Sequence, residues 1–199
     1  MEQLIVLGTG NAAVTKCFNT CFALQKNSEY FLVDTGGNGI LTALEKSGIP
    51  MEAIHDIFIS HEHCDHLLGV VWMIRMIATA MRKGSYEGDC RIYCHKGLVS
   101  VIDTIAKLTV LDKMDKMDKM VGERIFLTAV EDGEHIKILD YDVEFFDIHS
   151  TKAKQYGFTT VLDNGIIPET YMYLMIWSGS ACNKGFLFLS MNDIMRALL

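Results

Sequence analysis

The apolar and polar positions along the chain alternate with a period of two in some segments and near 3.6 in others. Short alternating or β-branched runs bounded by Gly, Asn, Asp or Ser predict strands, and longer runs with helical spacing predict helices. Strands are expected at 2–7, 20–24, 30–33, 57–60, 91–94, 136–139, 143–148 and 157–162. Helices are expected at 40–47, 65–82 and 98–108. Strands and helices that alternate without long loops indicate a layered α/β domain.

The longest apolar stretch lies within the expected helix at 65–82. It runs from Leu67 to Met81, is interrupted by Arg75 and is followed by Arg82. A membrane span needs about 20 predominantly apolar residues, so we expect a core helix here and no membrane association. The first apolar run, at 4–7, is too short for a signal peptide, and we therefore expect a cytoplasmic protein.

Two segments depart from the regular pattern. Residues 112–120 repeat Asp-Lys-Met three times, a period that suits neither a helix nor a strand and predicts a solvated helix end or loop. After Gly165 the chain becomes strongly apolar and carries few charges. Strands at 171–177 and 186–189 and a short helix at 192–199 are expected there.

The composition fits one compact domain spanning residues 1–199. Half of the 199 residues are hydrophobic and 22% are charged, which is enough for a sizeable core and is not typical of disorder. The six cysteines are expected to be reduced and mostly buried on strands. The net charge of −7 argues against broad affinity for nucleic acid, which depends on phosphate neutralisation.

A cluster of metal-ligand residues follows the expected strand at 57–60 directly. It reads His61-Glu62-His63-Cys64-Asp65-His66. Two residues that are two positions apart leave a strand on the same side, so the rings of His61 and His63 should point together. Asp65 and His66 follow where the loop becomes a helix. Imidazole and carboxylate groups bind zinc, and also iron or manganese, so the pattern predicts a metal site.

The pattern His-x-His-x-Asp-His resembles the signature of the metallo-β-lactamase superfamily. The resemblance covers residues 1–164 and implies an αββα sandwich of four layers; residues 165–199 form a divergent tail that leaves the second half of the fold short. Within the superfamily, Leu7-Gly8-Thr9-Gly10 and Phe146-Asp147-Ile148-His149-Ser150, followed by Gly157-Phe158, resemble the ribonuclease Z-like branch.

The resemblance also implies a ligand set. One metal ion would be held by His61, His63 and His149. The second would be held by Asp65 and His66, and Asp65 would also move a proton in catalysis. Two neighbouring cations lower the pKa of a shared water, so that hydroxide forms near neutral pH and attacks a phosphoryl or carbonyl group.

Asp34 stands where the family has an aspartate that orients a metal ligand through a hydrogen bond. It lies in Leu32-Val33-Asp34-Thr35-Gly36, directly after an expected strand. From the residues alone, a turn-forming aspartate before two glycines is the alternative.

The resemblance is incomplete at the second metal. The family has a bridging aspartate, usually after a glycine, and a late histidine, but no histidine follows His149. Asp193 is the candidate for the bridge, although Met191 and Asn192 precede it. Either the tail completes the site through Asp193, or the tail has been altered by truncation or frameshift. We expect one firmly held zinc ion and a second that is weak or absent.

These observations predict a metal-dependent hydrolase, in the first place a ribonuclease Z-like phosphodiesterase acting on a small-molecule or RNA phosphodiester. A thioester, lactone or β-lactam hydrolase of the same superfamily is the second hypothesis. The third is a metal-binding but inactive remnant, suggested by the missing late ligands. The apolar tail also suggests a homodimer or poor solubility.

Overall fold

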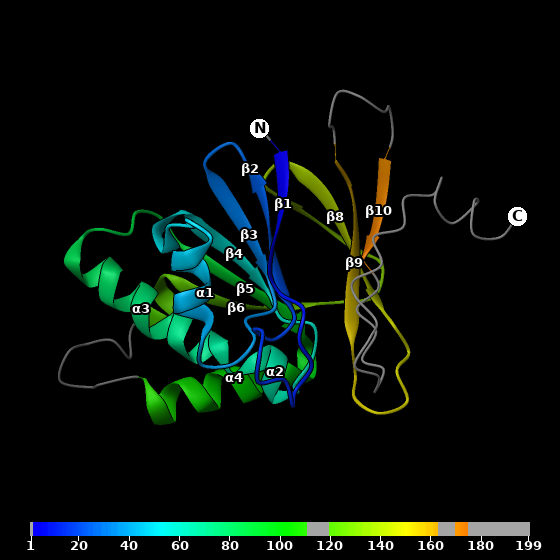
Figure 1. The fold of residues 1–199 in the computed structure, drawn as a ribbon, viewed down its shortest axis with the longest axis horizontal. Helices are drawn as coiled ribbons and strands as arrows, with labels where there is room; N and C mark the ends of the chain where they lie inside the picture. The colour runs from blue at the N-terminus through cyan, green and yellow to red at the C-terminus, as the bar shows by residue number, and fades with distance from the viewer. Residues whose placement is uncertain (1, 111–119, 163–169, 175–199) are drawn as a thin grey trace, which may run out of the picture.

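The structure is a computed structural model that describes residues 2–110, 120–162 and 170–174. Several expectations lie outside these residues: most of the Asp-Lys-Met repeat, the strand at 186–189, the helix at 192–199 and Asp193. The described part forms two sheets and a set of helices (Figure 1).

The larger sheet has six strands in the order β1-β2-β3-β4-β5-β6. The β1–β2 and β2–β3 pairs are antiparallel, and the pairs from β3 to β6 are parallel. The smaller sheet is antiparallel throughout, in the order β10-β9-β8-β7. The strands are β1 (Glu2–Gly8), β2 (Cys21–Lys26), β3 (Glu29–Val33), β4 (Ile54–Phe58), β5 (Cys90–His95), β6 (Ile125–Val130), β7 (Glu134–Ile138), β8 (Tyr141–Asp147), β9 (Tyr156–Leu162) and β10 (Thr170–Leu174).

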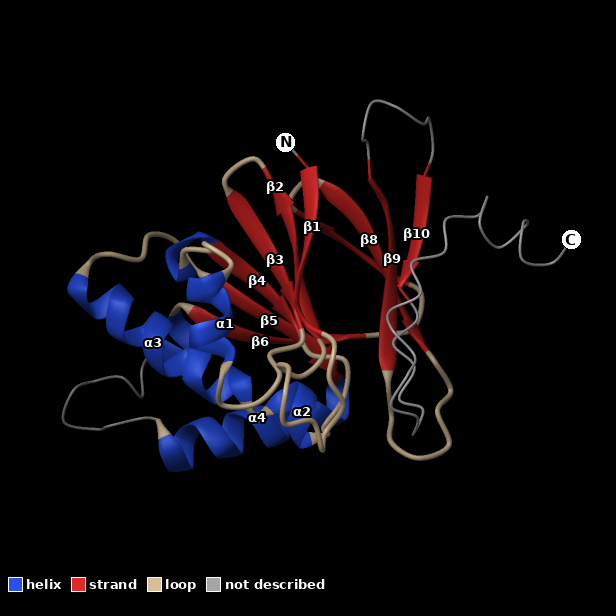
Figure 2. Ribbon diagram, viewed as in Figure 1, coloured by secondary structure: helices blue, strands red, loops and turns tan. Residues whose placement is uncertain are grey.

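The helices cover one face of the larger sheet, and the smaller sheet lies beyond its other face (Figure 2). They are α1 (Ile40–Lys46), the 3-10 turn η1 (Met51–Ala53), α2 (Cys64–Leu67), α3 (Gly69–Lys83), α4 (Lys96–Thr109) and α5 (Met120–Glu123). Three layers of the expected αββα sandwich are therefore in place. The outer helical layer on the smaller sheet is not among the residues described.

Two separate cores hold these layers together, because alternate side chains of the central strands point to opposite faces. One core packs the helices on the larger sheet. The other lies between the two sheets and is rich in aromatic rings. Phe58 of β4 is central to it, with ring centroids 5.1 Å from Phe145 and 5.8 Å from Phe158.

The expected elements are largely confirmed within the described residues. The short elements η1 and α5 were not predicted, and there are two larger differences. Strand β6 was not predicted, because its run Ile125–Val130 shows no polar alternation of the kind that marks a half-buried strand. The single helix expected at 65–82 is divided at Leu68. The carbonyl of His66 accepts from the Thr35 backbone N–H at 3.0 Å and from the Thr35 hydroxyl at 2.9 Å, and not from the next helical turn.

The start of α3 lies directly against the loop that follows β3. The Gly69 N–H donates to the Gly36 carbonyl at 2.9 Å, and a Cβ at position 69 would lie 2.0 Å from the Thr35 carbonyl oxygen. Only glycine allows this approach. The stretch Cys64–Lys83 is long and apolar enough to span a membrane by length and composition, but 61% of its 18-residue apolar window is buried, as expected of a core helix.

The cysteines match the expectation in part. All five that are described are free thiols. Cys21, Cys90 and Cys94 are buried on strands, as predicted, whereas Cys17 and Cys64 are exposed.

Phe145→Ala is expected to lower the free energy of unfolding by about 3–5 kcal/mol, because it removes a fully buried ring from the core between the sheets. Urea denaturation followed by circular dichroism would measure the loss. Leu108→Ala is the control, since Leu108 is 80% exposed and should change stability by less than about 0.5 kcal/mol. Equal effects of the two substitutions would contradict the packing described between the sheets.

Candidate metal centre

The predicted ligand residues lie at the carboxyl end of the parallel strands. Asp34 follows β3, and its N–H donates to the Phe58 carbonyl of β4 at 2.8 Å. Ser60 and His61 follow β4 after a short extended segment, in which the Ile59 N–H donates to the Tyr93 carbonyl of β5 at 2.9 Å. Open α/β sheets place ligand sites at this edge, where the loops that follow the strands meet.

Asp34 is the polar centre of the site. Its side chain is buried and accepts from the Ser60 backbone N–H at 2.8 Å, from the Ser60 hydroxyl at 2.9 Å and from His66 Nδ1 at 2.7 Å. Its backbone lies in the left-handed region, with φ at 56°, which aspartate tolerates better than most residues. These contacts are of the kind that the predicted orienting role of Asp34 requires, and the role itself stays a prediction.

Ser60 was not predicted as a functional residue, yet it connects Asp34 to His61. Its hydroxyl lies 2.8 Å from His61 Nδ1. Because the single hydroxyl proton goes to Asp34, His61 Nδ1 must carry the proton in the bond to Ser60. Nε2 of His61 therefore carries no proton and has a lone pair that can bind a metal ion. In His66, the bond from Nδ1 to Asp34 likewise leaves the lone pair on Nε2. The signal in the sequence was only that a hydroxyl residue precedes the first histidine.

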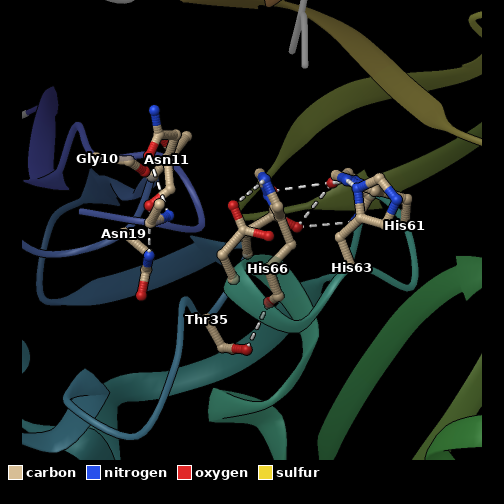
Figure 3. Close-up of polar contacts among 12 residues, drawn as sticks. Gly10, Asn11, Asn19, Thr35, His61, His63 and His66 are labelled. Atoms are coloured by element: carbon tan, nitrogen blue, oxygen red, sulfur yellow. Dashed lines mark hydrogen bonds and ion pairs between the residues drawn. The ribbon is translucent and has the colours of Figure 1, made fainter. Parts of the chain in front are cut away.

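The four motif side chains form two pairs, and Figure 3 shows the three histidines among them. His61 Nε2 lies 3.1 Å from His63 Nδ1, and His66 Nε2 lies 3.5 Å from an oxygen of Asp65. Two ligand atoms on one tetrahedral zinc ion are about 3.3–3.4 Å apart, since each lies about 2.0–2.1 Å from the metal. The rings of His61 and His66 are 4.2 Å apart, so the two pairs are neighbours. Each pair fits the donor set and spacing of one ion.

A third ligand is not brought to either pair. Within the described ranges, no three His, Cys, Asp or Glu side chains converge closely enough to hold a metal ion. The side chain of His149 is 82% exposed, and its ring lies 3.8 Å from Asp147 on its own loop. That loop begins and ends near the motif, because the Tyr156 N–H donates to the Ser60 carbonyl at 3.1 Å. The assignment of His149 as a ligand stays a prediction, as does that of Asp193.

The two central histidines have opposite electrostatic surroundings. Burial, with the neighbouring charges of His66 and His63, lowers the pKa of His61 to about 4. Burial also disfavours the charged form of His66, but the charge and hydrogen bond of Asp34 and the charge of Asp65 outweigh it and raise the pKa of His66. His61 is therefore neutral and ready to bind a cation at neutral pH, whereas His66 retains a proton more readily.

A cavity of about 770 Å³ lies beside Asp65. Its walls come from α2, α3, α4 and the loops after β1 and β3, including the loop in which the Asn19 amide donates to the Asn11 carbonyl at 3.0 Å (Figure 3). Most of the lining is apolar. It includes the indole ring of Trp72 on α3, and Trp72 is 44% exposed. The polar lining is provided by Asp65, Asn19, Asn38, Arg75 and Thr109.

Comparison with known families and structures agrees with this geometry. Residues 2–173 match the family described as "Anti-Pycsar protein Apyc1". The ribonuclease Z of Methanocaldococcus jannaschii is 34% identical over 107 residues, which are 53% of this chain and 32% of that protein. The chain thus spans about a third of the length of the curated relatives it matches.

Solved structures show the same fold. The human short-form tRNase Z superposes with a TM-score of 0.58 at 21% identity, covering 94% of this chain and 71% of that one. The metallo-β-lactamase fold protein YhfI from Bacillus subtilis superposes with a TM-score of 0.59 at 18% identity, covering 79% and 57%. The expected metallo-β-lactamase fold is confirmed, as is the resemblance to ribonuclease Z.

Asp34→Asn is expected to weaken zinc binding by about 10- to 100-fold, the usual effect of removing a group that orients a metal ligand. The amide can accept from Ser60 but loses the charge that holds His66. Competition with a chromophoric chelator would measure the affinity. Asp56→Asn is the matched control, because Asp56 is a buried carboxylate of the same sheet that bonds Arg91 and Tyr93 instead. Equal zinc affinities in the two variants would contradict the role given to Asp34.

Proposed function

We propose that this chain, which belongs to the anti-Pycsar protein Apyc1 family, is a metal-dependent hydrolase of phosphodiester bonds. The observation that carries the proposal is the pair of neighbouring ligand pairs, His61 with His63 and Asp65 with His66, at the edge of the larger sheet. The name of the ribonuclease Z relative supports a phosphodiester as the bond that is cleaved.

His61 and His63 would hold one ion, and Asp65 and His66 the second. We propose zinc for the first, although iron and manganese accept the same ligands. When bound, such an ion polarises a phosphoryl oxygen and lowers the pKa of water. A third ligand for the first ion would come from His149, whose loop is tied to Ser60.

The chain's own residues have separate tasks around these ions. Asp34 and Ser60 accept hydrogen bonds from Nδ1 of His66 and Nδ1 of His61, respectively. The lone pair on Nε2 of each ring is therefore available to bind a metal ion. Asp65 has 11% of its side chain exposed and borders the cavity. It is therefore the carboxylate placed to exchange a proton with a bound substrate, and we propose it as the catalytic residue.

The cavity favours a small substrate with a flat apolar group. A volume of about 770 Å³ is typical of sites for small molecules, and the Trp72 indole offers a stacking surface. The net charge of −7 disfavours a long polyanion such as RNA, whose binding depends on many phosphate contacts. We propose a small phosphodiester that carries a planar aromatic group.

The purified protein is expected to hydrolyse bis(p-nitrophenyl) phosphate, measured by release of p-nitrophenolate. Chelator treatment should abolish turnover, and added zinc or manganese should restore it. His63→Ala should reduce kcat/KM by more than about 100-fold, because loss of a direct ligand exceeds the 10- to 100-fold effect of an outer hydrogen bond. His135→Ala is the control, since His135 pairs with Asp142 on the smaller sheet and should retain activity.

Other outcomes of this assay would change the proposal. If the protein hydrolyses a thioester, lactone or β-lactam and no phosphodiester, the proposed substrate bond is wrong, whereas the proposed metal ligands stand. Stoichiometric metal uptake with no turnover on either panel would favour a metal-binding, inactive protein. Cleavage of RNA but not of the small diester would overturn the small-substrate proposal.

Trp72→Ala is expected to raise KM for bis(p-nitrophenyl) phosphate about 5- to 10-fold with little change in kcat. The substitution removes a ring contact, worth about 0.5–1.5 kcal/mol, without touching a metal-ligand pair. Leu108→Ala is a suitable control because its exposed side chain lies on α4 and does not line the cavity. An unchanged KM in Trp72→Ala would place the substrate elsewhere.

A further inference from the structure

The imidazole of His95 lies beside the metal-ligand motif but belongs to neither ligand pair. His95 is the last residue of β5 and precedes α4. The parallel register pairs Phe58 with Tyr93, which puts His95 level with Ser60. Tyr156, whose N–H donates to the Ser60 carbonyl, stacks its ring on His95 with centroids 6.0 Å apart. His95 is thus enclosed between the motif strand and the start of β9.

His95 is buried with unsatisfied hydrogen-bonding capacity. Only 8% of its side chain is exposed, and neither ring nitrogen has a hydrogen-bond partner in the part of the chain that is described. The ring lies over the first turn of α4, where a Cβ at Gly97 would come within 3.2 Å of it. A buried polar ring without a close hydrogen bond destabilises a fold, so its retention calls for a role.

Glu62 is the charged group placed to engage His95. An oxygen of its carboxylate lies 3.6 Å from His95 Nε2, so a shift of well under 1 Å would form a hydrogen bond. Glu62 stands between His61 and His63, at a bend in the short connection between β4 and α2. The carboxylate thus connects the motif to the end of β5.

His63 needs such an anchor more than its neighbours do. His61 is held by Ser60 and His66 by Asp34. Among the described residues, the His63 ring has a polar contact with His61 only. The direction of its ring therefore depends on the backbone that carries it, and Glu62 is the adjoining residue. Besides Glu62, the charged side chains close enough to interact electrostatically with His95 are those of Lys154 and Asp147.

We propose that His95 is a positioning residue of the metal centre: through Glu62 it fixes the segment that carries His61 and His63, so that both ligand nitrogens face one ion. The inference rests on the proposed function only in requiring that this pair binds metal. It assigns Glu62 and His95 to a second support of the site, separate from that of Asp34.

Cobalt(II) binding would test the inference, because the visible absorption of the ion reports its coordination geometry independently of catalysis. We expect His95→Ala and Glu62→Ala each to weaken cobalt and zinc binding about 10-fold and to alter the cobalt band. The double variant should bind metal as tightly as whichever single variant binds it less tightly, since the two residues act as a unit. His95→Gln, which restores a donor toward Glu62, should recover most of the affinity.

The controls separate this role from a general loss of stability. Glu62 is 44% exposed, so Glu62→Ala should fold even if His95→Ala does not. His135→Ala removes another histidine paired with a carboxylate and should leave the cobalt band unchanged. Additive effects of the two substitutions, or a lowered melting temperature with an unchanged cobalt spectrum and affinity, would overturn the inference. If the unmodified chain binds neither cobalt nor zinc, the proposed function fails with it.

Discussion

The hydrogen bonds received by the buried carboxylate of Asp34 are the interaction on which the site depends. They connect β3, which ends before Asp34, to β4, which leads to Ser60, and to α2, which carries His66. A buried carboxylate is costly unless its lone pairs are satisfied. The same bonds that stabilise Asp34 also set the proton positions on two histidines, so that folding and the geometry of the proposed metal site have a common origin.

The surrounding fold keeps these three elements in register. Thr35 bonds the end of α2, and Gly69 allows α3 to begin against the β3 loop. The aromatic core holds β4 from the other face of the sheet through Phe58. The edge at which the strands end is therefore clamped by helices on one side and by the second sheet on the other. Sites built on such rigid elements maintain ligand positions more closely than sites on free loops.

Much of this arrangement could be predicted from the sequence, for identifiable physical reasons. The strand that leads to the motif is rich in β-branched residues, and the four proposed ligand residues lie within six positions, where local geometry alone brings them together. The contacts of Ser60 and the positioning role proposed for His95 could not be predicted, because both depend on residues of other strands or loops. The break between α2 and α3 follows from a carbonyl taken by Thr35, 31 residues earlier. His149 is the opposite case. The family pattern predicts it as a ligand, but its position depends on the conformation of a loop that the local sequence does not determine.

Both ligand pairs and their main support come from the short stretch between Asp34 and His66. Chains emerge from the ribosome with the N-terminal part first, so every group of these two pairs is available before the second sheet has been synthesised. A metal ion held there as proposed would stabilise the early α/β half by mass action. Metal supply during translation would then influence how much of the protein reaches its folded state, and not only whether the finished protein is active.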